Sequence, residues 1–309
     1  MLGIITSQFP ELHETFVVRE LAALHAAGIP LRIYSLKRCR DRIVHPDAQP
    51  LRALTREMAW DDATIWIAGL ASCLRHPLRS ASALGWVFRY HGWPPLTMAK
   101  GLVVWIQSLA LARRMAEDGV THVHAHWATM PTTAALLAAR RLNRPFSFTA
   151  HAWDIFVRNP SLKEKVRLAR RVITCTDYNR RYLSHFCPDE QEKIVLNYHG
   201  VDLKQFSRGR VAAPAIRRPA ALLLSIGRLV ETKGFGTLLE AYRLLRERRV
   251  PFRAVIVGEG PLHRMLARKI RAYGLGGIVR VRPASDQDAL RRLYAQAAVF
   301  VLPCEVAAN

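Results

Sequence analysis

Acidic residues are scarce in this 309-residue sequence, which has 24 Asp and Glu against 46 Lys and Arg and a formal net charge of +22. Such an excess favours anionic partners, namely membrane phospholipid, phosphorylated substrates or nucleic acid. A general preference for arginine, which supplies 38 of the basic residues, would give the same charge. Nucleic-acid binders usually add exposed aromatic side chains to a basic groove, whereas most Trp and Tyr here lie in apolar periodic segments. We therefore expect no nucleic-acid partner.

Paired cysteines, a leader and long apolar runs are also missing. The five cysteines have neither paired nor metal-type spacing, which is typical of ordinary thiols in a reducing cytoplasm. The start, MLGIITSQFPELHE, lacks the basic residues and apolar core of a signal peptide. The longest apolar runs, IWIAGLASCL and GLVVWIQSLALA, are shorter than the about 20 residues that span a bilayer. We expect them to form helices buried in a core, with helices lying on a membrane surface as the alternative.

Short apolar runs alternate with amphipathic segments along the chain. The runs predict strands, and the segments between them predict helices with one apolar face. The alternation stops in the basic, proline-containing stretch SRGRVAAPAIRRP, which is typical of a linker. We therefore predict an α/β protein with two doubly wound parallel-sheet domains, residues 1–206 and 220–309, joined by a linker over 207–219. The expected strands are 2–7, 31–36, 120–126, 145–150, 172–176, 193–197, 221–227, 254–257, 279–281 and 299–302.

Residues directly after the strands are candidates for a site, because ligands of open α/β sheets bind outside the carboxyl ends of the strands. Gly227 and Arg228 follow one predicted strand, and Lys233 and Gly234 begin the next helix, whose N–H groups and dipole attract anions. Glycine lets the backbone approach a ligand, arginine offers a planar fork for two oxygens, and lysine offers a point charge. This pattern predicts a diphosphate clamp. A solvated cation pair, with Thr232 as the helix N-cap, is the alternative.

Histidines mark the ends of two other predicted strands. His151 ends FSFTAHAWD, where a neutral imidazole can bind a sugar hydroxyl or a growing phosphate charge, or can cap the turn as a structural residue. His122, His124 and His126 alternate in THVHAHW, so they face one side of a strand and could hold zinc. No nearby cysteine or carboxylate completes such a site. We instead expect His126 to reach the mouth of a cleft and the other two to be satisfied within the layer.

The common nucleotide-binding and catalytic motifs are absent where their structures would require them. None of GxGxxG, GxxxxGK[ST], GxSxG or HExxH occurs in such a context. Glu259 lies in GEGP, a predicted strand-to-helix turn whose lone GxG is a weak dinucleotide signal.

Seven stretches of the sequence, taken in order, carry a family resemblance. They are SQFPELHETFVVRELAAL, HVHAHWATMPTTAALLAARRLNRPFSFTAHAWDIF, VITCTDYNRRYL, KIVLNYHGVDLKQF, LLSIGRLVETKGFGTLLEAYRLL, VIVGEGPL and LYAQAAVFVLPC. Together they resemble the family-4 retaining glycosyltransferases of the GT-B fold, and the first is similar to the exopolysaccharide members. The resemblance implies two Rossmann-like domains that face each other across a cleft, the second of them incomplete in this chain.

The resemblance also implies roles for matching residues. Arg228 and Lys233 correspond to residues that contact the diphosphate of a nucleotide-sugar donor, with Gly227 and Gly234 beside them. His151 matches the histidine beside the donor sugar and phosphate, and it is the expected catalytic residue. Further candidates are His126, Asp154 and Glu259 at the donor or cleft, and His13, Glu14 and Thr15 in an acceptor loop.

The implied reaction is glycosyl transfer with retention, in which fixed cations stabilise the departing diphosphate. Domain closure is expected to bring His151 near the two cations. No metal or other cofactor is required, and the partners are a nucleotide-diphosphate sugar and a glycan or lipid-linked acceptor. The basic charge favours docking on the anionic inner face of the plasma membrane. The Glu-x7-Glu segment of relatives is missing before the chain ends, so a fragment is expected. The alternative is a GT-B domain without catalysis that serves as a binding or partner subunit.

Overall fold

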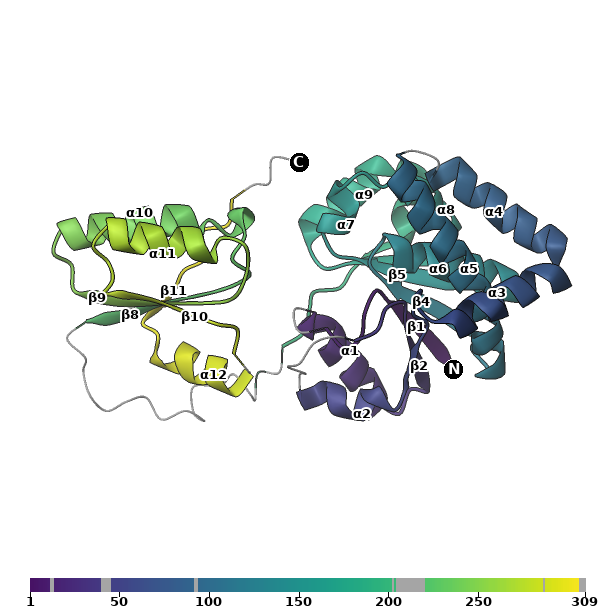
Figure 1. Ribbon diagram of the computed structural model, residues 1–309, viewed down its shortest axis with the longest axis horizontal. Coiled ribbons are helices and arrows are strands. Elements are labelled where there is room, and N and C mark those ends of the chain that lie inside the picture. The colour runs from purple at the N-terminus through teal and green to yellow at the C-terminus, as the bar shows by residue number, and fades with distance from the viewer. Residues whose placement is uncertain are drawn as a thin grey trace. The chain divides into compact units, whose positions relative to one another are not determined.

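The computed structural model describes residues 1–11, 14–39, 46–91, 94–201, 203, 220–285 and 287–305. The chain divides into two compact units, Met1–Val201 and Asp202–Asn309, and each contains a parallel β-sheet with helices packed on it (Figure 1). The predicted α/β class with two parallel sheets is therefore confirmed. The expected linker over 207–219 lies outside the described residues, and the predicted domain boundaries remain a prediction.

The first unit is built on a seven-stranded sheet whose order reverses in the middle. Its order is β3 (Thr55–Glu57), β2 (Leu31–Ser35), β1 (Leu2–Thr6), β4 (His122–His126), β5 (Phe146–Ala150), β6 (Arg171–Thr174) and β7 (Ile194–Leu196). All neighbouring strands are parallel. The chain runs outward from β1 through β2 to β3, and then returns to place β4 on the other side of β1. The carboxyl ends of β1 and β4 thus border a topological switch point, where doubly wound sheets bind ligands.

Alternating residues of β1 divide the first unit into two cores. Ile4 packs with the buried face of α1 (Thr15–Ala26), whereas Ile5 packs into the larger core on the opposite face. Side chains of a strand point to alternate faces, so both neighbours are buried when helices cover both sides. The remaining helices are α2 (Gln49–Arg52), α3 (Ala63–Arg75), α4 (Pro77–His91), α5 (Pro95–Glu117), α6 (Met130–Leu142), α7 (Trp153–Phe156), α8 (Leu162–Leu168) and α9 (Asp177–Phe186).

Helix α5 corrects one expectation. Its 23 residues are long and apolar enough, by length and composition alone, to cross a membrane, and among the described residues it is the single helix that is. Half of its most apolar stretch is buried within the unit. Gln107, on this helix, donates hydrogen bonds to the backbone oxygens of Leu36 (3.0 Å) and Met58 (2.6 Å) in the interior. The helix therefore belongs to the protein core, as the sequence predicted, although the run is longer than expected.

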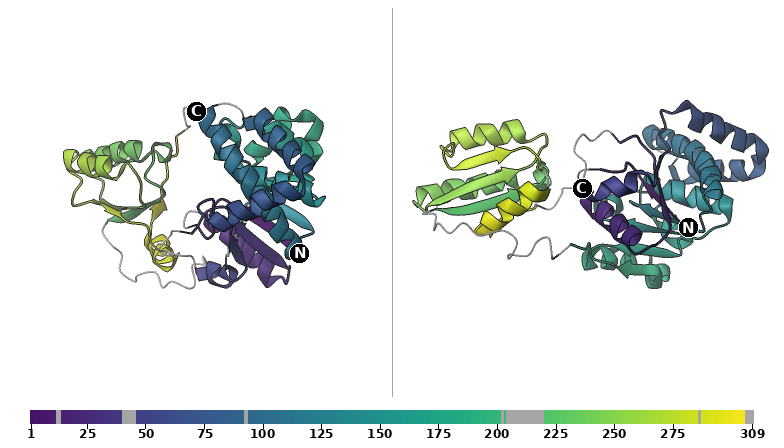
Figure 2. Two further views of the ribbon diagram at one scale, coloured as in Figure 1. Left: turned by 45° about the vertical axis from the view of Figure 1, so that its right-hand side comes forward. Right: turned by 90° about the horizontal axis from the view of Figure 1, so that it is seen from below.

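The second unit has a four-stranded sheet in the order β10 (Val279–Arg282), β9 (Phe252–Val257), β8 (Ala221–Ile226) and β11 (Val299–Phe300). Helices α10 (Phe235–Glu247) and α11 (His263–Ala272) cover one face, and α12 (Gln287–Gln296) covers the other (Figures 1 and 2). The strand order reverses between β8 and β11. The residues that follow these two strands therefore lie at the switch point of this unit.

Candidate active site

Two histidines lie side by side at the carboxyl ends of β4 and β5. The rings of His126 and His151 are stacked with their centres 5.7 Å apart. Phe16 from the first turn of α1 contacts the His151 ring at 4.7 Å, and Trp127 contacts it at 4.5 Å. Trp127 has φ = 77°, a left-handed backbone that is strained for a bulky side chain. The ends of three elements thus form one aromatic cluster around the predicted catalytic residue.

Asp154 builds the turn that carries His151. Its carboxylate accepts hydrogen bonds from the backbone N–H groups of His151 (2.9 Å), Ala152 (3.0 Å) and Ala128 (2.6 Å). The side chain is fully buried, and burial raises the pKa of Asp154. Both carboxylate oxygens of Asp154 are thus already used inside the protein, and its expected place at the donor or the cleft remains a prediction.

A buried lysine completes the support of this turn. The Lys165 ammonium donates hydrogen bonds of 2.8 Å to the backbone oxygens of Ala128 and Thr129. Burial lowers the pKa of Lys165 to about 7, and the nearby Asp154 carboxylate opposes that shift. The loop after β4 and the turn after β5 are consequently tied to one buried polar network.

Within the described part of the chain, the imidazole of His151 has no hydrogen-bond partner on either ring nitrogen, although only 5% of the residue is exposed. Burial, followed by the charges of His199 and His124, lowers the pKa of His151 to about 3. The ring is therefore neutral at physiological pH, with one donor and one acceptor nitrogen. Unpaired polar groups are rarely buried without a reason, and binding a ligand would satisfy both nitrogens.

The three β4 histidines share one face, as predicted, but they do not form a common site. His122 and His124 both bond the Ser147 hydroxyl at 2.8 Å, and His124 also bonds the Thr149 hydroxyl at 3.0 Å. These two are satisfied within the layer. His126 is fully buried within the first unit, and its expected place at the mouth of a cleft remains a prediction. Its Nε2 lies 4.0 Å from a carboxylate oxygen of Glu20.

The expected acceptor loop is only partly described. His13 lies outside the described residues. Glu14 is 9% exposed and directly precedes α1, and burial together with the Glu11 charge raises its pKa to about 8. Thr15 is half-buried in the first turn of the same helix. A carboxyl group with a raised pKa thus lies directly before α1, near the aromatic cluster.

In the second unit, the predicted glycines and lysine come together. Gly227 directly follows β8, and a β-carbon there would lie 3.8 Å from Cδ of Lys233. Gly234 precedes α10 with φ = 64°, and no side chain caps that helix end. Gly258, after β9, approaches so closely that a β-carbon would lie 1.9 Å from the backbone oxygen of Gly227. Arg228 is exposed in the loop between β8 and α10.

An anionic group already lies at this end of α10. Glu305, shortly after β11, accepts a 2.6 Å hydrogen bond from the Thr237 hydroxyl in the first turn of the helix. Thr237 could not be predicted from the sequence, because its contact with Glu305 depends on the pairing of β11 with β8. Glu259 is exposed in the turn after β9, and its backbone oxygen accepts from the N–H of Leu229 at 2.8 Å. The donor role of its carboxylate remains a prediction.

Sets of side chains that could hold a metal also occur at the strand ends. Among the described residues, His151, Cys175 and His199 form one group, and Glu20, His124 and His126 form another. In each group the potential ligand atoms all lie within 4.8 Å of one another. Cys175 and His199 were not among the sequence candidates; Cys175 lies within the predicted strand 172–176, and His199 closely follows the predicted strand 193–197.

Two domain families match the sequence. The family described as Glycosyltransferase Family 4 matches residues 13–205, and the one described as Glycosyl transferases group 1 matches residues 211–308. The chain is 28% identical to the colanic acid biosynthesis glycosyltransferase WcaL of Escherichia coli over 325 residues, covering 100% of this chain and 76% of that protein. It is 30% identical over 236 residues to a D-inositol 3-phosphate glycosyltransferase of Nocardiopsis dassonvillei, covering 67% of this chain and 54% of the relative.

Solved structures share the fold. A glycosyltransferase from Rickettsia africae superposes with a TM-score of 0.64 at 15% identity, covering 98% of this chain and 73% of the other. Sucrose-phosphate synthase from Thermosynechococcus elongatus also gives 0.64, at 18% identity, covering 98% and 75%. The structural neighbours have the GT-B architecture, as predicted for this chain.

Proposed function

This chain belongs to glycosyltransferase family 4, and we propose that it transfers a sugar, with retention, from a nucleotide-diphosphate donor to a glycan or lipid-linked acceptor. Relatives named for colanic acid biosynthesis support a place in exopolysaccharide synthesis. The reaction in this proposal needs no metal or other cofactor, and it takes place on the cytoplasmic side of the membrane.

The amino-terminal end of α10 is the observation that carries the donor assignment. Among the described residues no side chain caps this 13-residue helix, so its first N–H groups and its dipole favour an anion. Lys233 lies alongside Gly227, where a β-carbon would lie 3.8 Å from Cδ of the lysine. The Glu305 carboxylate beside Thr237 supports an anion at this helix end. We assign the donor diphosphate to this place, with Arg228 and Lys233 as its cations.

The proposed chemistry depends on where negative charge develops during the transfer. As the bond between the sugar and the phosphate lengthens, negative charge collects on the leaving diphosphate, and preorganised cations and helix N–H groups lower that barrier. The neutral His151 imidazole is suited to hydrogen-bond the sugar or the phosphate rather than to act as a charged acid, since its pKa is about 3. Asp154 acts through the backbone as a positioning residue, because it holds the turn that carries the imidazole.

A lipid-linked acceptor is supported by exposed leucines on two adjacent helices of the first unit. Leu70 and Leu74 on α3 are 53% and 83% exposed, and Leu78 at the start of α4 is 85% exposed. Exposed Arg75 and Arg79 lie next to them in the sequence. Apolar side chains flanked by basic ones are typical of surfaces that dock on anionic membranes. We therefore propose peripheral docking through this surface on the inner face of the membrane.

A transfer assay tests the proposed reaction. Purified chain is incubated with a panel of nucleotide-diphosphate sugars and lipid-extract acceptors, and the product is examined by NMR for the configuration of its new glycosidic bond. The proposal predicts a released nucleoside diphosphate and the same anomeric configuration as in the donor. An inverted product would overturn retention. Nucleotide binding without turnover of any donor would instead favour the reading of this chain as a binding subunit.

A further inference from the structure

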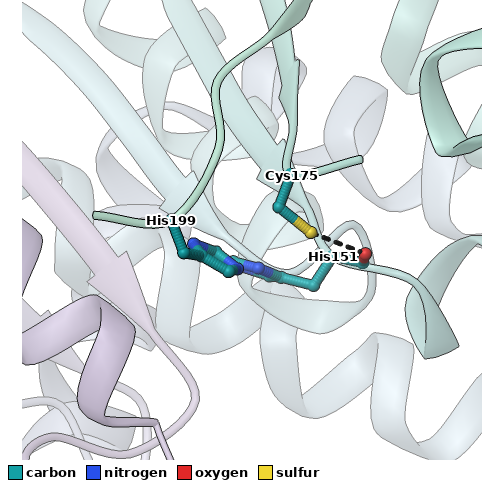
Figure 3. Close-up of side chains that lie close together, drawn as sticks. All are labelled: His151, Cys175 and His199. Carbon is teal, nitrogen blue, oxygen red and sulfur yellow. Dashed lines mark hydrogen bonds between the residues drawn. The ribbon is translucent and has the colours of Figure 1, made fainter. Parts of the chain in front are cut away.

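Three neighbouring strands of the first sheet end in potential metal ligands. His151 directly follows β5, Cys175 directly follows β6, and His199 lies three residues after β7. These strands are parallel neighbours, so their carboxyl ends meet at one edge of the sheet. Figure 3 shows the two imidazoles and the thiol converging there from three separate segments. All three ligand atoms lie within 4.8 Å of one another.

The two imidazole rings of this group are in direct contact. The rings of His151 and His199 are stacked, with centres 5.3 Å apart and planes inclined by 22°. The Phe16 ring stacks on His199 at 4.4 Å and restricts that side of the imidazole. Both ring nitrogens of His151 are buried and lack a hydrogen-bond partner among the residues that the structure describes. A metal bond to one of them would satisfy a polar atom that these residues leave unpaired.

The Cys175 thiol can rotate away from the backbone oxygen that it contacts without leaving that oxygen unpaired. Cys175 Sγ donates to the backbone oxygen of His151 at 3.1 Å, as the dashed line in Figure 3 marks. The side-chain amide of Asn179 donates to the same oxygen. Rotation of Cys175 toward the rings would therefore leave the carbonyl with a donor.

We propose that His151, Cys175 and His199 form a binding site for Zn²⁺, with a fourth position open to water or another ligand. Two imidazoles and a thiolate are nitrogen and sulfur ligands of the kind zinc prefers, and three protein ligands with an open position are common in zinc proteins. In a tetrahedral zinc site such atoms lie about 3.4 to 3.6 Å apart, from the usual Zn–N and Zn–S bond lengths. The three ligand atoms lie within 4.8 Å of one another, and side-chain rotation can bring them to that spacing because His199 is exposed and Cys175 is half-buried.

The other potential group is less suited to a metal. In Glu20, His124 and His126, the His124 ring already bonds the Ser147 hydroxyl through Nδ1 and the Thr149 hydroxyl through Nε2. Its two nitrogens are therefore occupied, whereas those of His151 are not. This difference favours the His151 group.

Binding of Zn²⁺ at this site releases one proton. The Cys175 thiol gives its proton to solvent, and the thiolate lone pair forms the Zn–S bond; both imidazoles bind as neutral ligands and nothing is oxidised or reduced. Because one His151 nitrogen would be held by the metal, zinc would inhibit glycosyl transfer. This consequence rests on the proposed function of His151, whereas the site itself does not.

Cobalt provides a direct probe of the site in the 309-residue chain. Metal-free protein is titrated with Co²⁺, and the absorption of a thiolate-to-cobalt charge-transfer band is recorded; Zn²⁺ is then added to displace the cobalt. We expect one equivalent of Co²⁺ to produce the band and Zn²⁺ to abolish it. Cys175→Ser should lose the band, and His199→Ala should weaken zinc affinity at least tenfold, since even the outer partners of metal ligands contribute that much.

Matched controls are available in the same unit. Cys73→Ser and the exposed His185→Ala change the same residue types away from the cluster and should keep the band and the affinity of the wild type. Circular dichroism confirms that each variant is folded. A wild-type protein without the band, or equal zinc affinity in Cys175→Ser and wild type, would overturn the site. Zinc binding that leaves the transfer rate unchanged would keep the site and overturn only its inhibitory effect.

Discussion

Gly234 and Pro303 approach each other so closely that a β-carbon at position 234 would lie 1.8 Å from the backbone oxygen of Pro303. Gly234 also has φ = 64°, a conformation that residues with a β-carbon adopt at a cost. The start of α10 and the segment after β11 are therefore packed backbone against backbone at the switch point of the second unit. The proposed diphosphate site depends on this contact, because it fixes the helix end that faces the ligand.

Replacing this glycine should destabilise the second unit. Gly234→Ala is expected to lower the free energy of unfolding by more than about 1 kcal/mol, since the methyl group both strains the backbone and meets a carbonyl. The matched control is Gly236→Ala, where a β-carbon would meet only Nζ of Lys269, at 3.9 Å. That change should be neutral or stabilise the helix by up to about 1 kcal/mol. Urea unfolding measures both, and equal stabilities would contradict the packing described here.

Removing the His151 imidazole should abolish most transfer without abolishing nucleotide binding. His151→Ala is expected to lower kcat about 100-fold or more, the loss typical of one preorganised hydrogen-bond partner in a transition state. Affinity for the nucleoside diphosphate should fall much less than kcat, because the two cations proposed for that group lie in the second unit. His185→Ala, at an exposed position of α9, is the control. Wild-type turnover in His151→Ala would remove this residue from the reaction.

Buried histidines should make the protein sensitive to acid. Burial, with a smaller contribution from the charge of His122, lowers the pKa of His124 to about 4 from an ordinary value of 6.5. Between these pH values the unfolded chain binds a proton that the folded protein does not, so stability falls as pH drops from 6.5 to 4. His124 alone would contribute up to about 3 kcal/mol to this loss. Unfolding free energies measured across this range should fall less steeply in His124→Gln, and an identical slope would exclude the contribution.

The affinity of the protein for anionic membranes should depend on its exposed leucines. The double change Leu74→Gln and Leu78→Gln removes two of the most exposed apolar side chains without altering charge. Binding to anionic liposomes in a flotation assay is expected to weaken at least tenfold, since burying one leucine contributes about 1.5 to 3 kcal/mol. Leu244→Gln, an exposed leucine on α10, serves as the control. Unchanged binding of the double variant would refute docking through α3 and α4.

Much of the fold could be predicted because both sheets are buried on two faces. Their strands appear as short apolar runs, and the residues directly after those runs can be identified without a structure. Gly227 after β8 and His151 after β5 were found in this way. The short strand β3 was missed, since TRE at 55–57 has no apolar residue and pairs only at the sheet edge.

Burial and strand order account for what the sequence did not predict. His126 and Asp154 carry chemically active groups next to the expected site, but whether such a group faces a ligand or the interior depends on packing. Cys175 and His199 join His151 only because β5, β6 and β7 are neighbours, an order that sequence periodicity does not contain. The left-handed backbone of Trp127 likewise could not be predicted, because that position carries neither glycine nor asparagine.

Titration calorimetry with nucleoside diphosphates tests the central assignment most directly. Wild-type protein should bind one equivalent, and Arg228→Ala and Lys233→Ala should each weaken binding by roughly 10- to 100-fold, because a hydrogen bond to a charged group contributes about 1.5 to 3 kcal/mol. Arg248→Ala removes an exposed cation at the far end of α10 and should bind as the wild type does. Wild-type affinity in both Arg228→Ala and Lys233→Ala would contradict the placement of the diphosphate and, with it, the proposed donor site.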